Sequence, residues 1–244
     1  MRDSARAFAP RITHLDGERV PWLAGYRVKS VDGNCLEASA HRLKELRDAT
    51  GRALPGTSLV VYAPARGVVT DVLPCAKGHA QERSRFGAVL DTVEAGDLWI
   101  EDRHVCPRAL LCAIDTRGAF CVTREHQGFP FAIVTPLRSS GRTPTGQVAQ
   151  QRVWVVEAHG HKPIFRRLRS KLHEATRDGA TLIHILTHVP RQVAAQQVAA
   201  RSRKRWTLET AFTHLEAYFH AAINTLGYPK AALCGFCLAL VASN

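Results

Sequence analysis

Strand-like and helix-like segments alternate through the first half of this chain, and a run of strand-like segments follows before the sequence becomes helical. The strand-like segments are short, rich in Val and aromatic residues, and bounded by Gly, Pro, Asn or Asp. Alternating strands and helices are typical of a sheet with helices packed on it, whereas an unbroken run of strands is typical of a β-rich unit. The sequence therefore predicts an α/β core interrupted by a mostly β insertion.

The expected elements of the core precede residue 119. Apolar periodicity and turn residues define each of them. In chain order we expect a strand over 26–35 that stops at Asp32-Gly33, a helix or turn over 41–51, two strands over 57–75 joined around residues 65–67 with Asp71 in the second, a helix over 80–96 with Gly96 as C-cap, a strand over 97–106 that ends at Asp102-Arg103, and a helix over 107–118.

The later part of the chain changes character. Strand-like segments over 119–134, 152–158 and 181–189 are separated by clusters of Gly, Pro and Ser such as RSSGRTPTG, and helical segments follow them. We therefore expect four regions: a poorly ordered N-terminal segment over 1–25, the first part of the core over 26–118, the β-rich insertion over 119–190, and the helical C-terminal part of the core over 191–244.

The chain is strongly basic, with 33 Lys and Arg against 21 Asp and Glu, a formal net charge of +12. Such a field attracts polyanions, of which nucleic acid is the commonest and an anionic membrane surface is the rival. No segment approaches the roughly 20 apolar residues of a membrane span, and the apolar stretch over 231–242 predicts a buried core helix. The first 20 residues lack a secretory signal. We expect a cytoplasmic protein with no membrane partner.

Cysteine and histidine spacing gives weak metal signals. The number of cysteines, seven, is odd and their spacing is irregular, which favours reduced thiols. Cys234 and Cys237 have the spacing of a zinc or redox pair, but no second ligand pair accompanies them, so buried thiols are the favoured interpretation. His184 and His188 would share a strand face, yet no acid or cysteine obviously completes a site around them.

Three acids stand out by position. Asp32 and Asp102 are expected at strand ends, and Glu209 lies in the helix over 205–219, beside its apolar stripe. Adjacent parallel strands and a helix packed on them could bring these carboxylates together. Mg²⁺ prefers such hard oxygen ligands, and two such ions can clamp a phosphoryl group in transfer. By spacing alone, three other acids fit almost as well: Asp71, Asp97 and Glu101.

The segments around these acids resemble those of the bacterial insertion-sequence DDE transposases, in the branch with a β-rich insertion before the catalytic glutamate. WIEDRHVC is similar to the second-aspartate segment, and SVDGNCLEAS is similar to the first. RKRWTLETAFTHLE is similar to the glutamate segment, in which an arginine precedes the glutamate by four positions. The order of the segments also agrees, and the resemblance extends over 26–244.

The resemblance implies a ribonuclease-H-like core, a mixed sheet with flanking helices. It implies that Asp32, Asp102 and Glu209 bind Mg²⁺ or Mn²⁺ and perform strand cleavage at transposon ends, followed by transfer of the 3′ hydroxyl to target DNA. A homodimer is expected in the DNA complex. The basic residues expected to contact DNA are Arg205, Lys204, Arg203, Arg201 and Arg103.

Three departures from the family pattern point to an alternative. Ser202 replaces a tyrosine, Glu216 replaces a lysine, and only 31 residues precede Asp32, where relatives carry a helical DNA-binding region. An acid on the active face repels phosphate. The alternative is therefore an inactive or truncated remnant that only binds DNA; a nuclease without strand transfer is a third reading.

Two further features remain open at this point. The basic run over 162–171 is either a solvated charged face or a phosphate-binding segment. Trp154 and Trp206 are expected in the core rather than as base-stacking platforms. The phosphate-binding pattern GxxxxGK[ST] and the nucleophile pattern GxSxG do not occur, so nothing in the sequence indicates ATP use or a serine nucleophile.

Overall fold

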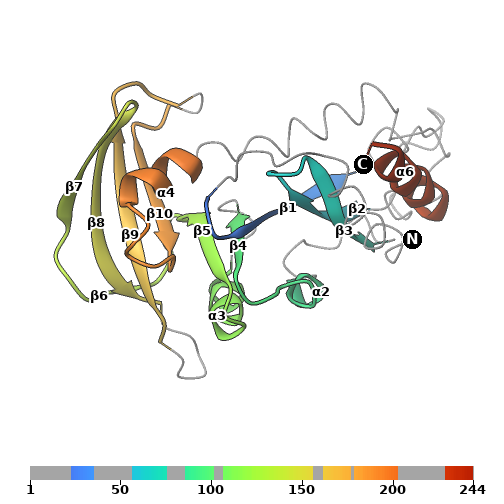
Figure 1. Ribbon diagram of the computed structural model, residues 1–244, viewed down its shortest axis with the longest axis horizontal. Helices are drawn as coiled ribbons and strands as arrows, with labels where there is room; N and C mark the ends of the chain where they lie inside the picture. The colour runs from blue at the N-terminus through green and yellow to red at the C-terminus, as the bar shows by residue number, and fades with distance from the viewer. Residues whose placement is uncertain are drawn as a thin grey trace, which may run out of the picture. The chain divides into compact units, whose positions relative to one another are not determined.

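The computed structural model shows a mixed α/β protein whose chain divides into two compact units (Figure 1). It describes residues 23–35, 57–75, 86–101, 107–155, 162–176, 179–202 and 229–243. Unit 1 comprises Met1–Pro21, Ser30–Val89 and Trp206–Asn244, and unit 2 comprises Trp22–Lys29 and Leu90–Arg205. The expected helix or turn over 41–51 and the expected helix over 205–219 lie outside the described residues.

Unit 1 contains an antiparallel sheet with a helix packed on it. Its strands are β1 (Arg27–Cys35), of which the first three residues count with unit 2, β2 (Thr57–Ala63) and β3 (Val68–Cys75), in the order β3-β2-β1. The short helix α2 (Phe86–Leu90) and the helix α6 (Pro229–Ser243) complete the described elements. The predicted strand pair over 57–75 is confirmed, and its turn places Gly67 at a φ of 72°.

The core of unit 1 forms because apolar side chains of β2 and β3 meet one face of α6. The buried residues of this cluster are Val60, Tyr62, Val69, Val72, Phe236, Cys237, Ala239 and Leu240. The prediction of a C-terminal helix is confirmed, and the expected burial holds for one of its sides only. Leu238 and Val241, on its other side, are 62% and 39% exposed.

The predicted stop at Asp32-Gly33 is wrong. β1 continues to Cys35, and Gly33 pairs with Leu59 of β2 in an antiparallel register. Pairing with β2 satisfies the backbone groups of these residues, so the ladder overrides the turn preference of the Asp-Gly pair. Asp32 therefore lies within β1, opposite Val60.

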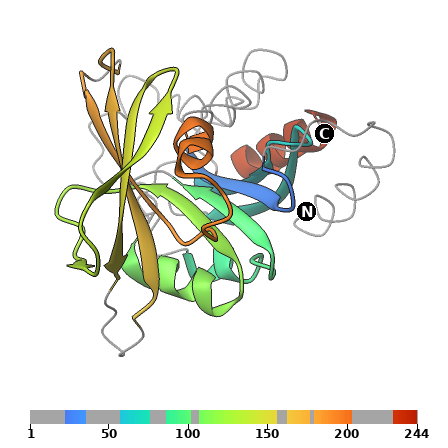
Figure 2. The same ribbon diagram turned by 60° about the vertical axis from the view of Figure 1, so that its left-hand side comes forward.

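Unit 2 is built on a mixed sheet (Figure 2). Its strands are β4 (Asp97–Glu101), β5 (Phe120–Arg124), β6 (Ala132–Ile133), β7 (Arg138–Thr143), β8 (Gly146–Trp154), β9 (Ile164–Leu172) and β10 (Leu182–Thr187), and its helices are α3 (Arg108–Thr116) and α4 (Ala195–Ser202). The strand order, which begins at the first residues of β1, is β1-β4-β5-β10-β9-β8-β6, with β7 also paired to β8. β4 and β5 are parallel and are connected through α3, whereas β8, β9 and β10 are antiparallel.

Helix α4 covers one face of the antiparallel strands. Its residues Val198 and Ala199 lie in the same buried cluster as Val148, Leu168 and Ile185 of β8, β9 and β10. Leu98, Ile100 and Val122 of β4 and β5 belong to that cluster too. Burial of these aliphatic side chains stabilises the sheet and fixes which of its faces meets the helix.

Three further predictions need correction. The segment RSSGRTPTG is a strand and a turn rather than a spacer, because β7 pairs with β8. Helix α2 ends at Leu90, so Gly96 is not its C-cap but lies in the turn before β4 at a φ of 82°. Trp154 is not a core residue; it is 42% exposed, near the end of β8.

The described helices do not include one long and apolar enough to cross a bilayer.

Candidate functional site

The three predicted metal ligands occupy parts of the chain where no side chain is described. Asp32 is placed in β1 by its backbone, Asp102 comes directly after the last residue of β4, and Glu209 falls in the stretch over 203–228. Whether the three carboxylates meet therefore remains a prediction. Of the residues predicted to contact DNA, Arg103, Arg203, Lys204 and Arg205 likewise lie outside the described residues.

Strand β4, which leads to Asp102, is buried along its whole length. Leu98 and Ile100 point into the core of unit 2, and Glu101 is buried beside β5, opposite Thr123 in the parallel register. A buried acid is costly unless it has polar partners, so a buried carboxyl group at this strand end is unusual. Glu101, which sequence alone did not separate from Asp102, is buried at this end.

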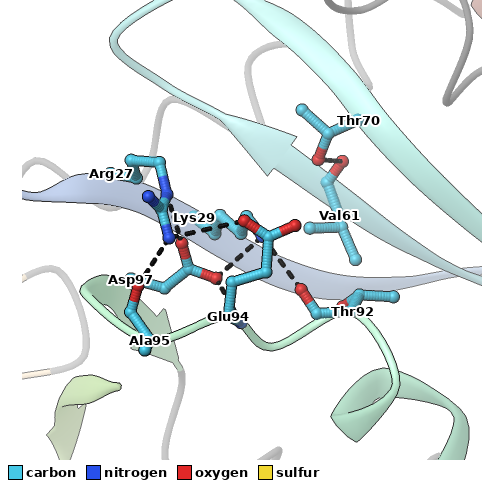
Figure 3. Close-up of polar contacts among 8 residues, drawn as sticks. All are labelled: Arg27, Lys29, Val61, Thr70, Thr92, Glu94, Ala95 and Asp97. Atoms are coloured by element: carbon cyan, nitrogen blue, oxygen red, sulfur yellow. Dashed lines mark hydrogen bonds and ion pairs between the residues drawn. The ribbon is translucent and has the colours of Figure 1, made fainter. Parts of the chain in front are cut away.

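A cluster of charged groups fixes the start of β4 against the start of β1 (Figure 3). Asp97 has no exposed side-chain surface, and its carboxylate accepts from Arg27 Nε at 2.9 Å and from Lys29 Nζ at 2.8 Å. The backbone N–H of Glu94 also donates to Asp97, at 2.9 Å. Both oxygens of Asp97 are thus engaged by cations of the same unit.

These contacts distinguish among the acids that looked equally suitable as metal ligands in the sequence. Asp97 serves to hold β1 and β4 together and is a poor candidate for a metal ligand, because a metal would have to displace Arg27 and Lys29. Asp71 is buried in β3 of unit 1, where it accepts from the backbone N–H of Val72 at 2.9 Å. Sequence reasoning missed the ion pairs of Arg27 and Lys29 with Asp97, because the sequence of one strand does not specify which acid lies next to it in the sheet.

A second polar cluster surrounds His188, just after β10. Its Nε2 donates to the carbonyl of Ala119 at 2.7 Å, so its Nδ1 accepts from the thiol of Cys121 at 3.3 Å. The ring packs against Phe120 and Phe165, with centroids 5.5 Å and 4.8 Å away. The side chain of His188 is 6% exposed and is hydrogen-bonded to Ala119 and Cys121, a cysteine that the spacing of the histidines did not indicate.

The surroundings keep both groups of this cluster neutral. Burial raises the pKa of Cys121, and the negative charges of Glu101 and Asp115 add to that effect. Burial lowers the pKa of His188, opposed by its bond to Ala119 and by Asp115. A thiol held protonated and inaccessible is a weak nucleophile, so Cys121 is structural rather than catalytic.

We expect His188 to make stability depend on pH. The pKa of His188 lies below 6.5 in the folded state, so the unfolded chain binds the proton more readily, and stability falls as pH drops below about 6.5. This group contributes up to about 1.4 kcal/mol per pH unit in that window. His188→Gln should flatten the slope of unfolding free energy between pH 7 and pH 5.5, measured by urea denaturation. His173→Gln, which removes an exposed imidazole, is the matched control; equal slopes in His188→Gln and the parent would contradict the assignment.

The basic run over 162–171 divides into cations held by the protein and cations that face solvent. Arg166 is buried and donates through Nη1 to the carbonyls of Val189, Pro190 and Val193, at 2.9 to 3.3 Å. Burial and the charge of Arg191 lower its pKa. The run is therefore not a solvated face as a whole.

Its neighbour Arg167 is also held within the fold. Arg167 forms a two-pronged ion pair with Glu125, at 2.5 Å and 3.0 Å, and lies over the ring of Phe131. By contrast, Arg169 and Lys171 are exposed. Alternation along β9 puts Arg167 on the same face as Arg169 and Lys171, and Arg166 on the other face. Arg167 differs from Arg169 because Glu125 pairs with it, a contact that sequence alone did not reveal.

Helix α4 is the last described element before Glu209 in the sequence. Arg201, in its last turn, is half-buried, and Ser202 donates its hydroxyl to the carbonyl of Ala199 at 2.9 Å. Within the described ranges, no group of three or more His, Cys, Asp or Glu side chains is arranged to hold a metal ion.

Comparison with known proteins gives a similarity of fold. No protein-family model matches the chain, and no curated protein matches its sequence. The fold is similar to that of a chain in a cryo-EM structure described as "piggyBac transposase synaptic complex with hairpin DNA", with a TM-score of 0.53 and 10% sequence identity. The similarity covers 92% of this chain and 46% of that chain, so this chain spans less than half the length of the transposase. The predicted mixed α/β fold is thereby confirmed, and it is similar to the fold of that transposase chain.

Proposed function

We propose that this protein is a DDE-type transposase of the bacterial insertion-sequence group, which cleaves DNA strands at element ends and transfers them to a target. The observation that carries the proposal is the similarity of fold to a transposase over 92% of the chain. It agrees with the order of the Asp32, Asp102 and Glu209 segments in the sequence. The net charge of +12 suits a DNA partner.

The donor set fits Mg²⁺ or Mn²⁺. Asp32, Asp102 and Glu209 offer hard carboxylate oxygens, the donors that these ions prefer over thiols. Asp97 is excluded from the set by its pairing with Arg27 and Lys29. When bound, the ions would supply activation of water and of the 3′ hydroxyl and neutralise charge at the scissile phosphate.

Basic residues of the chain would hold the DNA against the metal ions. Three carboxylates alone repel DNA, so basic side chains are needed close to them. Arg205 would contact phosphate or steady Glu209, while Arg103, Arg201, Arg203 and Lys204 would hold the DNA backbone. The protein would act in the cytoplasm and as a homodimer on DNA.

A remnant that binds DNA without turnover is the second candidate. Ser202 occupies the position of a family tyrosine, and its hydroxyl is used within α4 on the carbonyl of Ala199. Glu216 places an acid where the family has a lysine. Both replacements would weaken phosphate binding near the scissile bond, and the other basic residues of the chain would still bind DNA.

Incubation with supercoiled plasmid tests the proposal. We expect nicked circles when purified protein is supplied with Mn²⁺ or Mg²⁺, and none when EDTA removes the metal, because the carboxylates act only through bound cations. Protein that binds plasmid but does not nick it under any metal would establish the remnant. Nicking without joined products in a strand-transfer assay would establish a nuclease instead.

A further inference from the structure

The face of β7, β8, β9 and β10 that points away from α4 carries regular rows of polar and basic side chains. Residues directly opposite in an antiparallel ladder share a face. One row runs Arg142, Gln147, Lys171, Leu182, and the next runs Ser139, Ala149, Arg169, His184. We call this surface, defined by Arg142, Arg169 and Lys171 with Gln147 and Ser139 between them, the basic sheet face.

The two faces of these strands differ in what covers them. Val148, Leu168 and Ile185 point to the other face and are buried together with Val198 of α4. On the basic sheet face, Arg142, Arg169, Lys171, Gln147 and Ser139 are exposed. The strands therefore bury one face under α4 and leave part of the other face exposed at these five residues. Farther along that second face, Val153, Phe165 and Leu186 are buried.

Cations outnumber acids in the segment that contains these strands. The described residues between 138 and 187 contain the single acid Glu174 against eight cations: Arg138, Arg142, Arg152, Lys162, Arg166, Arg167, Arg169 and Lys171. Arg166 and Arg167 are held by carbonyls and by Glu125. Arg169 and Lys171 follow each other on one face of β9, roughly 7 Å apart along the strand, and Arg142 lies in the same row as Lys171. Exposed cations that outnumber the acids around them form a surface that attracts a polyanion.

We propose that the basic sheet face binds the phosphate backbone of duplex DNA, through side chains other than the proposed metal ligands and the cations next to them in sequence. The intervening Gln147 and Ser139 are hydrogen-bonding groups that suit phosphate and sugar oxygens, whereas an anionic membrane would favour apolar side chains at its contact. The choice of DNA as the polyanion rests on the proposed function. The surface positions the duplex and reads no sequence.

Duplex binding measured across a salt series tests this surface. In the variant Arg142→Gln/Arg169→Gln/Lys171→Gln, we expect the dissociation constant to rise by more than about tenfold and the slope of log affinity against log salt to fall by about 2.7, since each phosphate contact contributes about 0.9. The matched control is Arg66→Gln/Arg117→Gln/Arg191→Gln, which removes the same charge from three exposed positions elsewhere. Circular dichroism of both variants should match the parent.

Each alternative outcome overturns the inference. An unchanged slope, or an equal loss in the control variant, would show that only the overall charge attracts DNA. Loss of binding to phosphatidylserine vesicles with unchanged DNA binding would assign the surface to a membrane. If the triple variant nicks plasmid normally and binds duplex as tightly as the parent, only the role of the basic sheet face is overturned. If the parent does not nick, but the triple variant still shows the smaller salt slope, only the enzymatic proposal is overturned.

Discussion

Glu209→Gln is expected to lower plasmid nicking by roughly 10³-fold while leaving duplex affinity nearly unchanged. Loss of one carboxylate from a two-metal site removes several kcal/mol of transition-state stabilisation, and about 4 kcal/mol corresponds to that factor. Asp32→Asn and Asp102→Asn should have effects of the same size. Because the three carboxylates would act as a unit, a double variant should be little worse than a single one.

The controls for this prediction are a charge-matched variant and a binding measurement. Glu174→Gln removes an acid that is exposed and remote from the proposed ligands in sequence, so its nicking rate should equal that of the parent. Duplex affinity of Glu209→Gln should stay level or rise slightly, since removal of a negative charge favours DNA. If Glu209→Gln nicks as fast as the parent, the catalytic assignment is wrong whatever the fold.

The sequence predicts the elements of this fold where the local pattern and the tertiary pairing agree. The strand pair over 57–75 has apolar residues along both strands and a turn at Gly67, and α3 has an apolar face that meets the core. β7 carries no such signal, because its residues are polar and their strand conformation comes from pairing with β8. The extension of β1 past Asp32 likewise depends on β2, a partner that a single strand sequence does not specify.

The candidate site shows the same limit. Asp97 and Asp102 stand at the two ends of one predicted strand and look equivalent in sequence, yet the structure gives Asp97 two cationic partners from β1. The run over 162–171 looked uniform, and only its three-dimensional surroundings distinguish buried Arg166 from exposed Arg169. Long-range partners decide these roles, and spacing along the chain contains little information about them.

Those partners make Asp97 an acid whose loss should lower stability strongly. Asp97→Asn is expected to lower the free energy of unfolding by about 3 kcal/mol, because it leaves Lys29 in a largely buried position without its counter-charge. Lys29 is 15% exposed and is also held by the carbonyl of Thr92 at 2.9 Å, so it cannot turn freely to water. Urea denaturation followed by circular dichroism measures the change.

Two comparison variants make the cause specific. Arg27→Gln should cost less than about 1 kcal/mol, because the Arg27 side chain is 54% exposed and its ion pair is weakened by solvent. Lys29→Met/Asp97→Leu, which replaces the buried pair by apolar groups, should recover much of the stability lost in Asp97→Asn. If Asp97→Asn unfolds at the same urea concentration as the parent, the charge cluster does not hold β1 to β4. Asp97 would then again be a candidate metal ligand, as Asp102 is.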